Sequence, residues 1–155
     1  MKKWMIWAGA AVVALVGTVA VRTATFKPGA VGDGSTDDAT AIQAAIDACA
    51  SGGRVLFGPK TYLVAAKLTL TEPNVMIQGV GHGASVLKMT SATLYALEID
   101  DHRVVVRDMK FLHTTSTATN GGAIHLKSGG YAQILFCTFD GGWYENVHVT
   151  DGYAW

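Results

Sequence analysis

Five acidic and histidine side chains near the C-terminal end of the chain are of types that carry out acid–base chemistry. They are Asp140, Glu145, Asp151, His125 and His148. Enzymes that hydrolyse a glycosidic bond use two carboxyl groups that flank the bond, about 6.5–9.5 Å apart when the configuration is inverted. Enzymes that break such a bond by elimination use a base, often with a cation that holds the carboxylate of the sugar. These five residues are therefore the weak catalytic candidates.

Two pairs of matching segments show how the candidates are spaced. Residues 121–129 match residues 144–152 at an offset of 23, and residues 106–111 match residues 134–139 at an offset of 28. A period in the twenties, with strands that recur in phase, is typical of a solenoid. Each strand of such a solenoid lies about 4.8 Å from the equivalent strand of the previous turn. The matches therefore predict which side chains lie side by side.

This phase does not stack any two carboxylates. It aligns Asp108 with Phe136, Asp140 with Leu112, Glu145 with Gly122, and Asp151 with Ser128. We therefore interpret these acids as solvated turn residues, among which Asp140, Glu145 and Asp151 are the best of the weak candidates.

The phase does stack His125 on His148. Each lies between two apolar neighbours that point inward, so both imidazoles should point outward, about 4.8 Å apart. A surface ladder, a pair in a groove and an adventitious metal site all fit this arrangement. We expect no carboxylate at a convincing position beside either histidine. No metal motif with standard spacing is present, so no metal site is predicted.

Aromatic residues also gather near the C-terminus. Trp143, Tyr144 and Tyr153 could stack on sugar rings, since aromatic faces pair an apolar surface with a wet edge. Filling of the core at the corners of the turns is the alternative explanation. The three residues are weak substrate-binding candidates.

One helix and a series of strands must position these groups. A helix over about residues 37–50 carries an apolar stripe of Ile42, Ala45, Ile46 and Cys49, and Thr36 or Asp37 should be its N-cap. The rest of the chain is rich in short β-branched and apolar segments broken by Gly, Pro, Asn and Asp. The expected strands are 54–57, 61–64, 68–71, 75–78, 85–89, 96–99, 104–111, 123–127, 133–139 and 146–150. We expect the helix to cover the first turn, where a solenoid exposes its strand edges and core.

Residues 29–38, GAVGDGSTDD, and the later Pro59-Lys60-Thr61-Tyr62 resemble the opening of the pectate-lyase-like superfamily. The resemblance is to its rhamnogalacturonase/epimerase-like group, which also occurs in phage tail spikes; Lys60-Thr61 departs from the usual glycine before the tyrosine. It implies an all-β fold, a right-handed single-stranded parallel β-helix with an N-terminal capping α-helix. It also implies a polysaccharide partner.

The resemblance leaves two functions open. The first is the N-terminal portion of an exported polysaccharide-degrading protein, a lyase or a glycosidase. The alternative is a non-catalytic glycan-binding or structural β-helix, such as a tail-spike module, which could form a homotrimer. No cofactor is evident, and Ca²⁺ would be expected only for a lyase. A formal net charge of zero predicts no nucleic-acid-binding patch.

The N-terminal segment has a different character from the rest. Lys2 and Lys3 precede an uncharged apolar run over residues 4–21. The pattern indicates either a signal peptide over residues 1–20 or an uncleaved membrane anchor. Both place the remainder outside the cytoplasm, as an extracellular or periplasmic protein or as a β-helix held at the membrane. We expect residues 21–155 to be a truncated, N-terminal part of a longer β-helix, inactive alone, because the last repeat is interrupted at Trp155.

Overall fold

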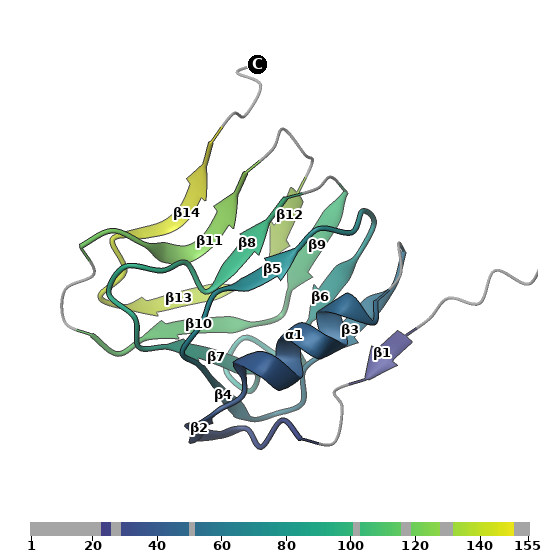
Figure 1. Ribbon diagram of the computed structural model, residues 1–155, viewed down its shortest axis with the longest axis horizontal. Coiled ribbons are helices and arrows are strands. Elements are labelled where there is room, and N and C mark those ends of the chain that lie inside the picture. Colours follow the sequence, from purple (N-terminus) through teal and green to yellow (C-terminus); the bar gives the residue numbers. More distant parts are fainter. Residues whose placement is uncertain are drawn as a thin grey trace, which may run out of the picture.

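The described part of the chain folds as a parallel β-solenoid of about four turns with one short helix near its N-terminal end (Figure 1). The computed structural model describes residues 23–25, 29–49, 52–100, 103–115, 119–127 and 132–150. The predicted signal or anchor over residues 1–20, and the apolar run to residue 21, lie outside these ranges. In the part that is described, no helix is long and apolar enough to cross a bilayer.

Three parallel sheets form the walls of the solenoid. Sheet A contains β1 (Thr23–Thr25), β3 (Arg54–Leu56), β6 (Met76–Gln78), β9 (Val104–Arg107) and β12 (Ala132–Leu135). Sheet B contains β2 (Asp33–Asp37), β4 (Thr61–Val64), β7 (Val86–Met89), β10 (Lys110–His113) and β13 (Thr138–Gly141). Sheet C contains β5 (Leu68–Leu70), β8 (Leu97–Ile99), β11 (Gly122–Leu126) and β14 (Glu145–Val149). Each of the last four turns contributes one strand to each sheet, whereas the first turn contributes β1 and β2 and has a helix in place of a strand of sheet C. This repeat confirms the predicted parallel β-helix.

The registers confirm the predicted phase. Val106 pairs with Ile134 in sheet A, and His125 pairs with His148 in sheet C. The offsets differ from turn to turn, because Ile77 follows its partner Val55 by 22 residues whereas Val106 follows Ile77 by 29. The strands thus keep their pairing while the corners between them vary in length.

The interior is a continuous apolar column. Inward residues of successive turns stack on one another, as do the rings of Phe111 and Phe139, whose centroids are 5.4 Å apart. Burying a large apolar side chain stabilises a fold by roughly 1.5–3 kcal/mol. The column is therefore the main source of stability, and it fixes which residues face outward.

Two predicted strands are each divided by a corner. The expected strands over 104–111 and 133–139 each change from sheet A to sheet B, at Asp108 and Phe136 respectively. Both residues adopt left-handed conformations, with φ of 57° and 53°. Continuous strands were wrong here because a two-residue corner leaves almost no gap in the apolar pattern, and because neither corner carries a glycine.

Helix α1 (Ala39–Asp47) lies across the N-terminal end of the solenoid (Figure 1). The predicted stripe of Ile42, Ala45, Ile46 and Cys49 is buried. The helix is shorter than the expected range of 37–50, and its N-cap is Asp38 rather than Thr36 or Asp37. Thr36 and Asp37 belong to β2 instead. The Asp38 carboxylate makes no cap bond, because it accepts hydrogen bonds from the backbone N–H groups of residues 31 and 32.

Gln43 of α1 closes the free edge of sheet C. Strand β5 is the last strand of that sheet, and the Gln43 amide both accepts from the Thr69 N–H and donates to the Thr69 carbonyl, each at 2.8 Å. The side chain thus takes the place of a further strand at this position. Unpaired strand edges are sites of unwanted association, so this contact protects the sheet as well as holding the helix.

Candidate functional site

The outer face of sheet C carries one row of polar side chains across all four of its strands. Thr69, Glu98, His125 and His148 pair directly, one from each strand. Their positions follow from the strand period of two, because the residues on either side of each pack inward or at the strand ends. The solenoid therefore brings together residues that are far apart in the sequence.

Glu98 contacts three basic side chains on the outer face of sheet C. It is only 5% exposed, and it accepts from Lys67 Nζ at 2.8 Å and Lys127 Nζ at 3.1 Å. His125 Nδ1 lies 3.3 Å from the same carboxylate. Burial alone would raise the pKa of Glu98, but the hydrogen bonds from the two lysines outweigh it and lower the pKa. Glu98 is thus ionised and holds three basic groups in place.

A second carboxylate, Glu145, completes the row on the C-terminal side. Its Oε2 atom accepts from the Tyr95 hydroxyl at 3.1 Å and lies 2.5 Å from His148 Nδ1. The Tyr95 ring stacks on His125, with centroids 4.6 Å apart. Burial, followed by the hydrogen bond to Glu145, raises the pKa of Tyr95 to about 12. Tyr95 therefore keeps its proton at neutral pH and acts as a donor.

The two histidines are close to each other but differ in their surroundings. Their ring centroids are 5.1 Å apart. His125 uses both ring nitrogens, since Nε2 lies 2.9 Å from the Thr150 hydroxyl. His148 contacts Glu145 through Nδ1 and is more exposed, with 33% of its side chain accessible. If Nδ1 carries the proton, Nε2 of His148 has a lone pair that is free to take one.

We name these side chains the sheet C cluster: Lys67, Tyr95, Glu98, His125, Lys127, Glu145 and His148. The structure thus brings together three of the sequence candidates, His125, His148 and Glu145. The expectation that neither histidine has a carboxylate beside it was wrong, because Glu98 pairs with His125 and Glu145 contacts His148. Glu98 could have been found by aligning residues 97–99 with residues 124–126.

The remaining sequence candidates lie elsewhere. Asp140 is on sheet B, where it forms an ion pair of 2.7 Å with Lys110, whose hydrogen bond lowers the pKa of the Asp140 carboxyl. Tyr144 is 61% exposed next to Glu145, so it remains available to a ligand of the cluster. Trp143 packs against the core and against His113, with centroids 4.6 Å apart. Asp151 and Tyr153 lie outside the described residues.

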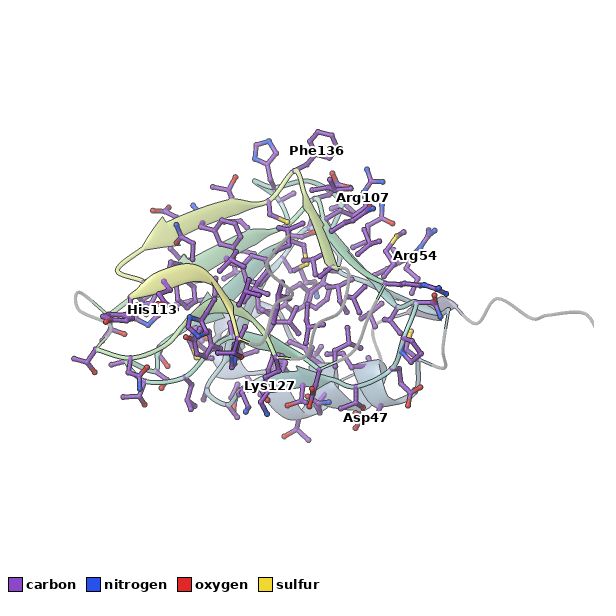
Figure 2. All side chains as sticks on the ribbon, turned by 90° about the horizontal axis from the view of Figure 1, so that it is seen from above. Asp47, Arg54, Arg107, His113, Lys127 and Phe136 are labelled. Atoms are coloured by element: carbon purple, nitrogen blue, oxygen red, sulfur yellow. The ribbon has the colours of Figure 1, made fainter. Side chains whose placement is uncertain are left out.

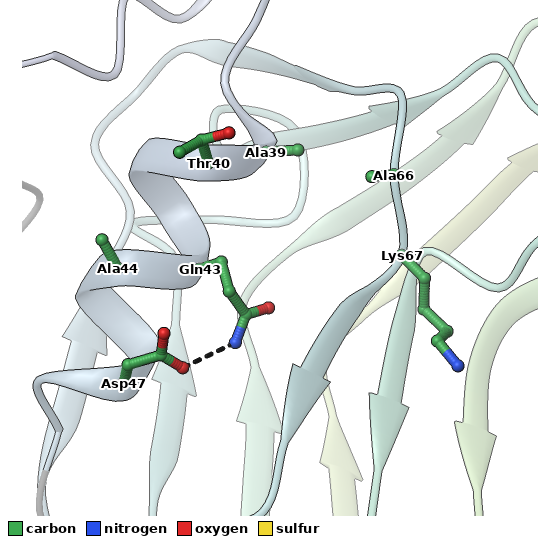
Figure 3. A pocket seen from close by; sticks show the side chains of 7 residues that line it. All are labelled: Ala39, Thr40, Gln43, Ala44, Asp47, Ala66 and Lys67. Atoms are coloured by element: carbon green, nitrogen blue, oxygen red, sulfur yellow. Dashed lines mark hydrogen bonds between the residues drawn. The ribbon is translucent and has the colours of Figure 1, made fainter.

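A hollow beside α1 has fewer side chains that could take part in a reaction than the sheet C cluster has. Its volume is about 370 Å³, and its lining is Ala39, Thr40, Gln43, Ala44, Asp47, Ala66 and Lys67 (Figure 3). Gln43 is held by Asp47 and by β5, and the Lys67 ammonium is bound to Glu98. Asp47 is the only acid in this lining, so the hollow lacks a pair of groups for proton transfer.

The described residues also contain no group of three or more His, Cys, Asp or Glu side chains arranged to hold a metal ion. The basic groups of the sheet C cluster are instead paired with its two carboxylates. The cluster is therefore suited to proton transfer and to binding of polar or anionic groups.

Comparison with known proteins agrees with the fold and its opening motif. Residues 25–141 match the family model described as rhamnogalacturonase A/epimerase, pectate lyase-like. The chain belongs to this family. The match confirms the resemblance seen in residues 29–38 and 59–62.

Individual relatives share only part of their length with this chain. Mannuronan C5-epimerase AlgE6 of Azotobacter vinelandii is 45% identical over 74 residues, which are 42% of this chain and 8% of the relative. Alginate lyase 7 of the same organism is 44% identical over 69 residues, which are 39% of this chain and 8% of the relative. The chain thus spans less than a tenth of these two relatives.

A solved structure is also similar. ORF18 of Geobacillus virus E2 superposes with a TM-score of 0.59 at 28% identity, over 76% of this chain and 25% of that one. The chain is therefore similar in sequence to polysaccharide-modifying proteins and similar in structure to a viral protein.

Proposed function

We propose that this chain is part of a protein that binds a uronate-containing polysaccharide across the sheet C cluster and transfers a proton at C5 of the sugar. The observation that carries the proposal is the contact of Glu145 with both Tyr95 and His148 on the outer face. This contact provides a proton donor and a proton acceptor side by side. The names of the relatives, an epimerase of mannuronan and an alginate lyase, support the class of polymer.

The chemistry needs three kinds of group. A base removes the C5 proton, which is adjacent to the uronate carboxylate, and the electron pair left behind spreads onto that carboxylate. A cation or hydrogen-bond donor must stabilise the charge that develops there. Return of a proton to the opposite face of C5 gives the epimer. Expulsion of the oxygen on C4 instead gives a C4–C5 double bond, which is the lyase reaction.

The cluster contains a residue for each role. His148 Nε2 is the base, because Glu145 binds Nδ1 and sets the tautomer. Tyr95, on the same side as His148, donates a proton to the leaving oxygen in the lyase reaction. In the epimerase reaction, water on the opposite face of the sugar returns the proton to C5. Lys127, whose side chain is 44% exposed, receives the uronate carboxylate while Glu98 holds its position.

Removal of the C5 hydrogen tests the proposal, because it is common to both reactions. In D₂O the epimerase replaces this hydrogen by deuterium, whereas the lyase removes it together with the oxygen on C4. The protein is incubated with a mannuronate oligosaccharide in D₂O, and the C5 signal and new double bonds are followed by NMR. Exchange at C5 or new double bonds with the wild type, and the loss of both in His148→Gln with binding retained, would support the base. Loss of the double bonds in Tyr95→Phe with binding retained would support the donor. Oligosaccharide binding with neither exchange nor new double bonds, in the 155-residue form and in a longer form of the protein, would refute the proposal.

A second candidate is a non-catalytic glycan-binding module. The similarity to the protein of Geobacillus virus E2 favours it, since it covers more of this chain than either Azotobacter relative does. Under this alternative the cluster is a binding surface, and binding without exchange is its expected result. Homotrimer formation, which light scattering would detect, would add to its support.

We further propose that the protein is exported and that its coil is right-handed. Support for export comes from the two lysines and the apolar run over residues 4–21. Mass spectrometry of the exported protein distinguishes the two forms, since a new N-terminus at Val21 indicates a signal peptide and retention of Met1 indicates an anchor. Support for handedness comes from the strong preference of parallel crossovers for the right-handed form.

A further inference from the structure

The corner between β12 and β13 holds an aromatic residue in a conformation that such residues rarely adopt. Phe136 has φ of 53°, and its side chain lies outside the core, since the residue is 70% exposed. The left-handed region disfavours residues with a Cβ, and Gly, Asn and Asp are its usual occupants. The equivalent corner of the previous turn has Asp108. Neither burial nor backbone preference explains Phe136, and such an outlier supports a functional hypothesis.

Arg107 lies beside this ring. Its guanidinium carbon is 5.9 Å from the ring centroid, and its Nε donates to Asp108 Oδ2 at 2.6 Å. The bond to Asp108 fixes the plane of the guanidinium but uses only one of its five N–H donors. The two terminal nitrogens of Arg107 therefore remain for a ligand, next to the exposed face of the Phe136 ring.

On strands β3, β6, β9 and β12 of the sheet A wall, no outward position is an acid, and the acid nearest to Arg107 is its partner Asp108 at the corner after β9. The outward positions of β3, β6, β9 and β12 are Arg54, Leu56, Met76, Gln78, Val105, Arg107, Gln133 and Leu135. They comprise two cations, two amides and four apolar side chains. Their charge is complementary to an anionic ligand, and their amides are suited to hydroxyl groups.

This wall is separate from the sheet C cluster. Figure 2 shows Phe136 and Arg107 together at one side of the molecule and Lys127, a member of the cluster, at the opposite side. A ligand at one location therefore does not occupy the other. We name Gln78, Arg107, Leu135 and Phe136 the Phe136 surface; the first three pair in one row of sheet A.

We propose that the Phe136 surface binds a carboxylated pyranose of an acidic polysaccharide, as a second glycan site. The C–H face of the sugar packs on Phe136, and its carboxylate takes a fork of two hydrogen bonds from Arg107. Gln78 and Leu135 border the same sugar. The proposal rests on the proposed function for its class of ligand. A second copy of the chain is a poorer occupant, because packing face to face would bring the Arg107 side chains of the two copies together.

The test is titration of the 155-residue protein with a mannuronate oligosaccharide, followed by NMR shifts of the Phe136 ring and by calorimetry. Phe136→Asn removes the ring and places a residue that favours the left-handed corner, so it should be at least as stable as the wild type. We expect it to weaken the Phe136 site about tenfold, as loss of one aromatic stacking contact predicts. Arg107→Gln should weaken it by a similar factor, and a neutral mannose oligosaccharide should not distinguish Arg107→Gln from the wild type.

The outcomes separate this site from the proposed function. Unchanged oligosaccharide binding in Phe136→Asn, with shifts confined to the sheet C cluster, would overturn the second site and leave the proposed function standing. Equal binding of the neutral oligosaccharide at Phe136 would overturn the assigned carboxylate. A wild-type oligomer that dissociates in Phe136→Asn without any shift on titration would overturn the proposal in favour of contact between copies. Loss of C5 exchange in His148→Gln, with Phe136 shifts intact, supports both sites.

Discussion

Replacement of Glu98 by glutamine tests whether this carboxylate organises the sheet C cluster. The wild-type side chain is almost fully buried and accepts from Lys67 and Lys127 while contacting His125. Glutamine has nearly the same shape and keeps one carbonyl oxygen, so the packing should survive. What changes is the charge, and one of the oxygens becomes an amide that cannot accept.

The expected loss in the free energy of unfolding is modest. The two lysine side chains are 36% and 44% exposed, so solvent screens them and each ion pair is worth about 0.5–1 kcal/mol rather than the value of a fully buried pair. Their sum predicts a loss of about 1–2 kcal/mol near neutral pH. Urea denaturation followed by circular dichroism measures it.

The pH dependence gives the sharper test. The pKa of Glu98 is lower in the folded state than its ordinary value of 4.5, so the unfolded state binds the proton more readily. The stabilisation is therefore complete above the ordinary value and is lost as the pH falls through the folded value. The difference between wild type and Glu98→Gln should thus be present near neutral pH and vanish in acid.

Asp140→Asn is the matched control, because it removes one carboxylate from a pair with a lysine on the same solenoid. The Asp140 side chain is 55% exposed and solvent screens its charge, so its loss should lower the free energy of unfolding much less than the loss of the Glu98 charge does. An equal loss in both variants would show that net charge, not the place of Glu98, sets the effect. A difference between wild type and Glu98→Gln that does not change with pH would refute the ionic explanation.

Three further changes follow from single contacts. Gln43→Ala removes two hydrogen bonds to the Thr69 backbone and should cost about 1–2 kcal/mol in urea denaturation, whereas no change would show that the edge of β5 needs no cover. Gly141→Ala should cost about 2–4 kcal/mol, because φ is 98° and an added Cβ would lie 2.0 Å from the His113 carbonyl oxygen; wild-type stability would contradict this geometry. Tyr95→Phe should remove the tyrosine that ionises near pH 12 in an absorbance titration, and persistence of that phase would assign it to another tyrosine.

The sequence predicted the fold well because the equivalent strands of a solenoid have similar residues at a regular spacing along the chain. Matching residue types at offsets of 23 and 28 correspond to strands that pair, and the pairs Val106–Ile134 and His125–His148 confirm it. The apolar stripe of α1 was likewise readable, because burial of one helical face requires it.

The site was harder to predict because it joins unlike residues. Glu98 and His125 are partners but not similar, so a search for matching polar residues does not find them, although the apolar residues on both sides of each do match. Lys67 and Lys127 stand just outside the strands, where corners of variable length blur the phase. Phe136 was also hidden, since an aromatic residue is the opposite of what backbone preference suggests for a left-handed corner.

The variable length of the corners determines where this fold tolerates insertions during evolution. A residue inserted within β11 would turn His125 inward and Leu126 outward, and would destroy the row and the core at once. A residue inserted in a corner leaves every register intact, as the different lengths of the turns already show. Insertions and deletions confined to the corners should therefore disturb this fold little, whereas those within a strand shift its register. The corners can therefore lengthen into new loops during evolution while the row of side chains on sheet C keeps its pairing and the protein stays folded.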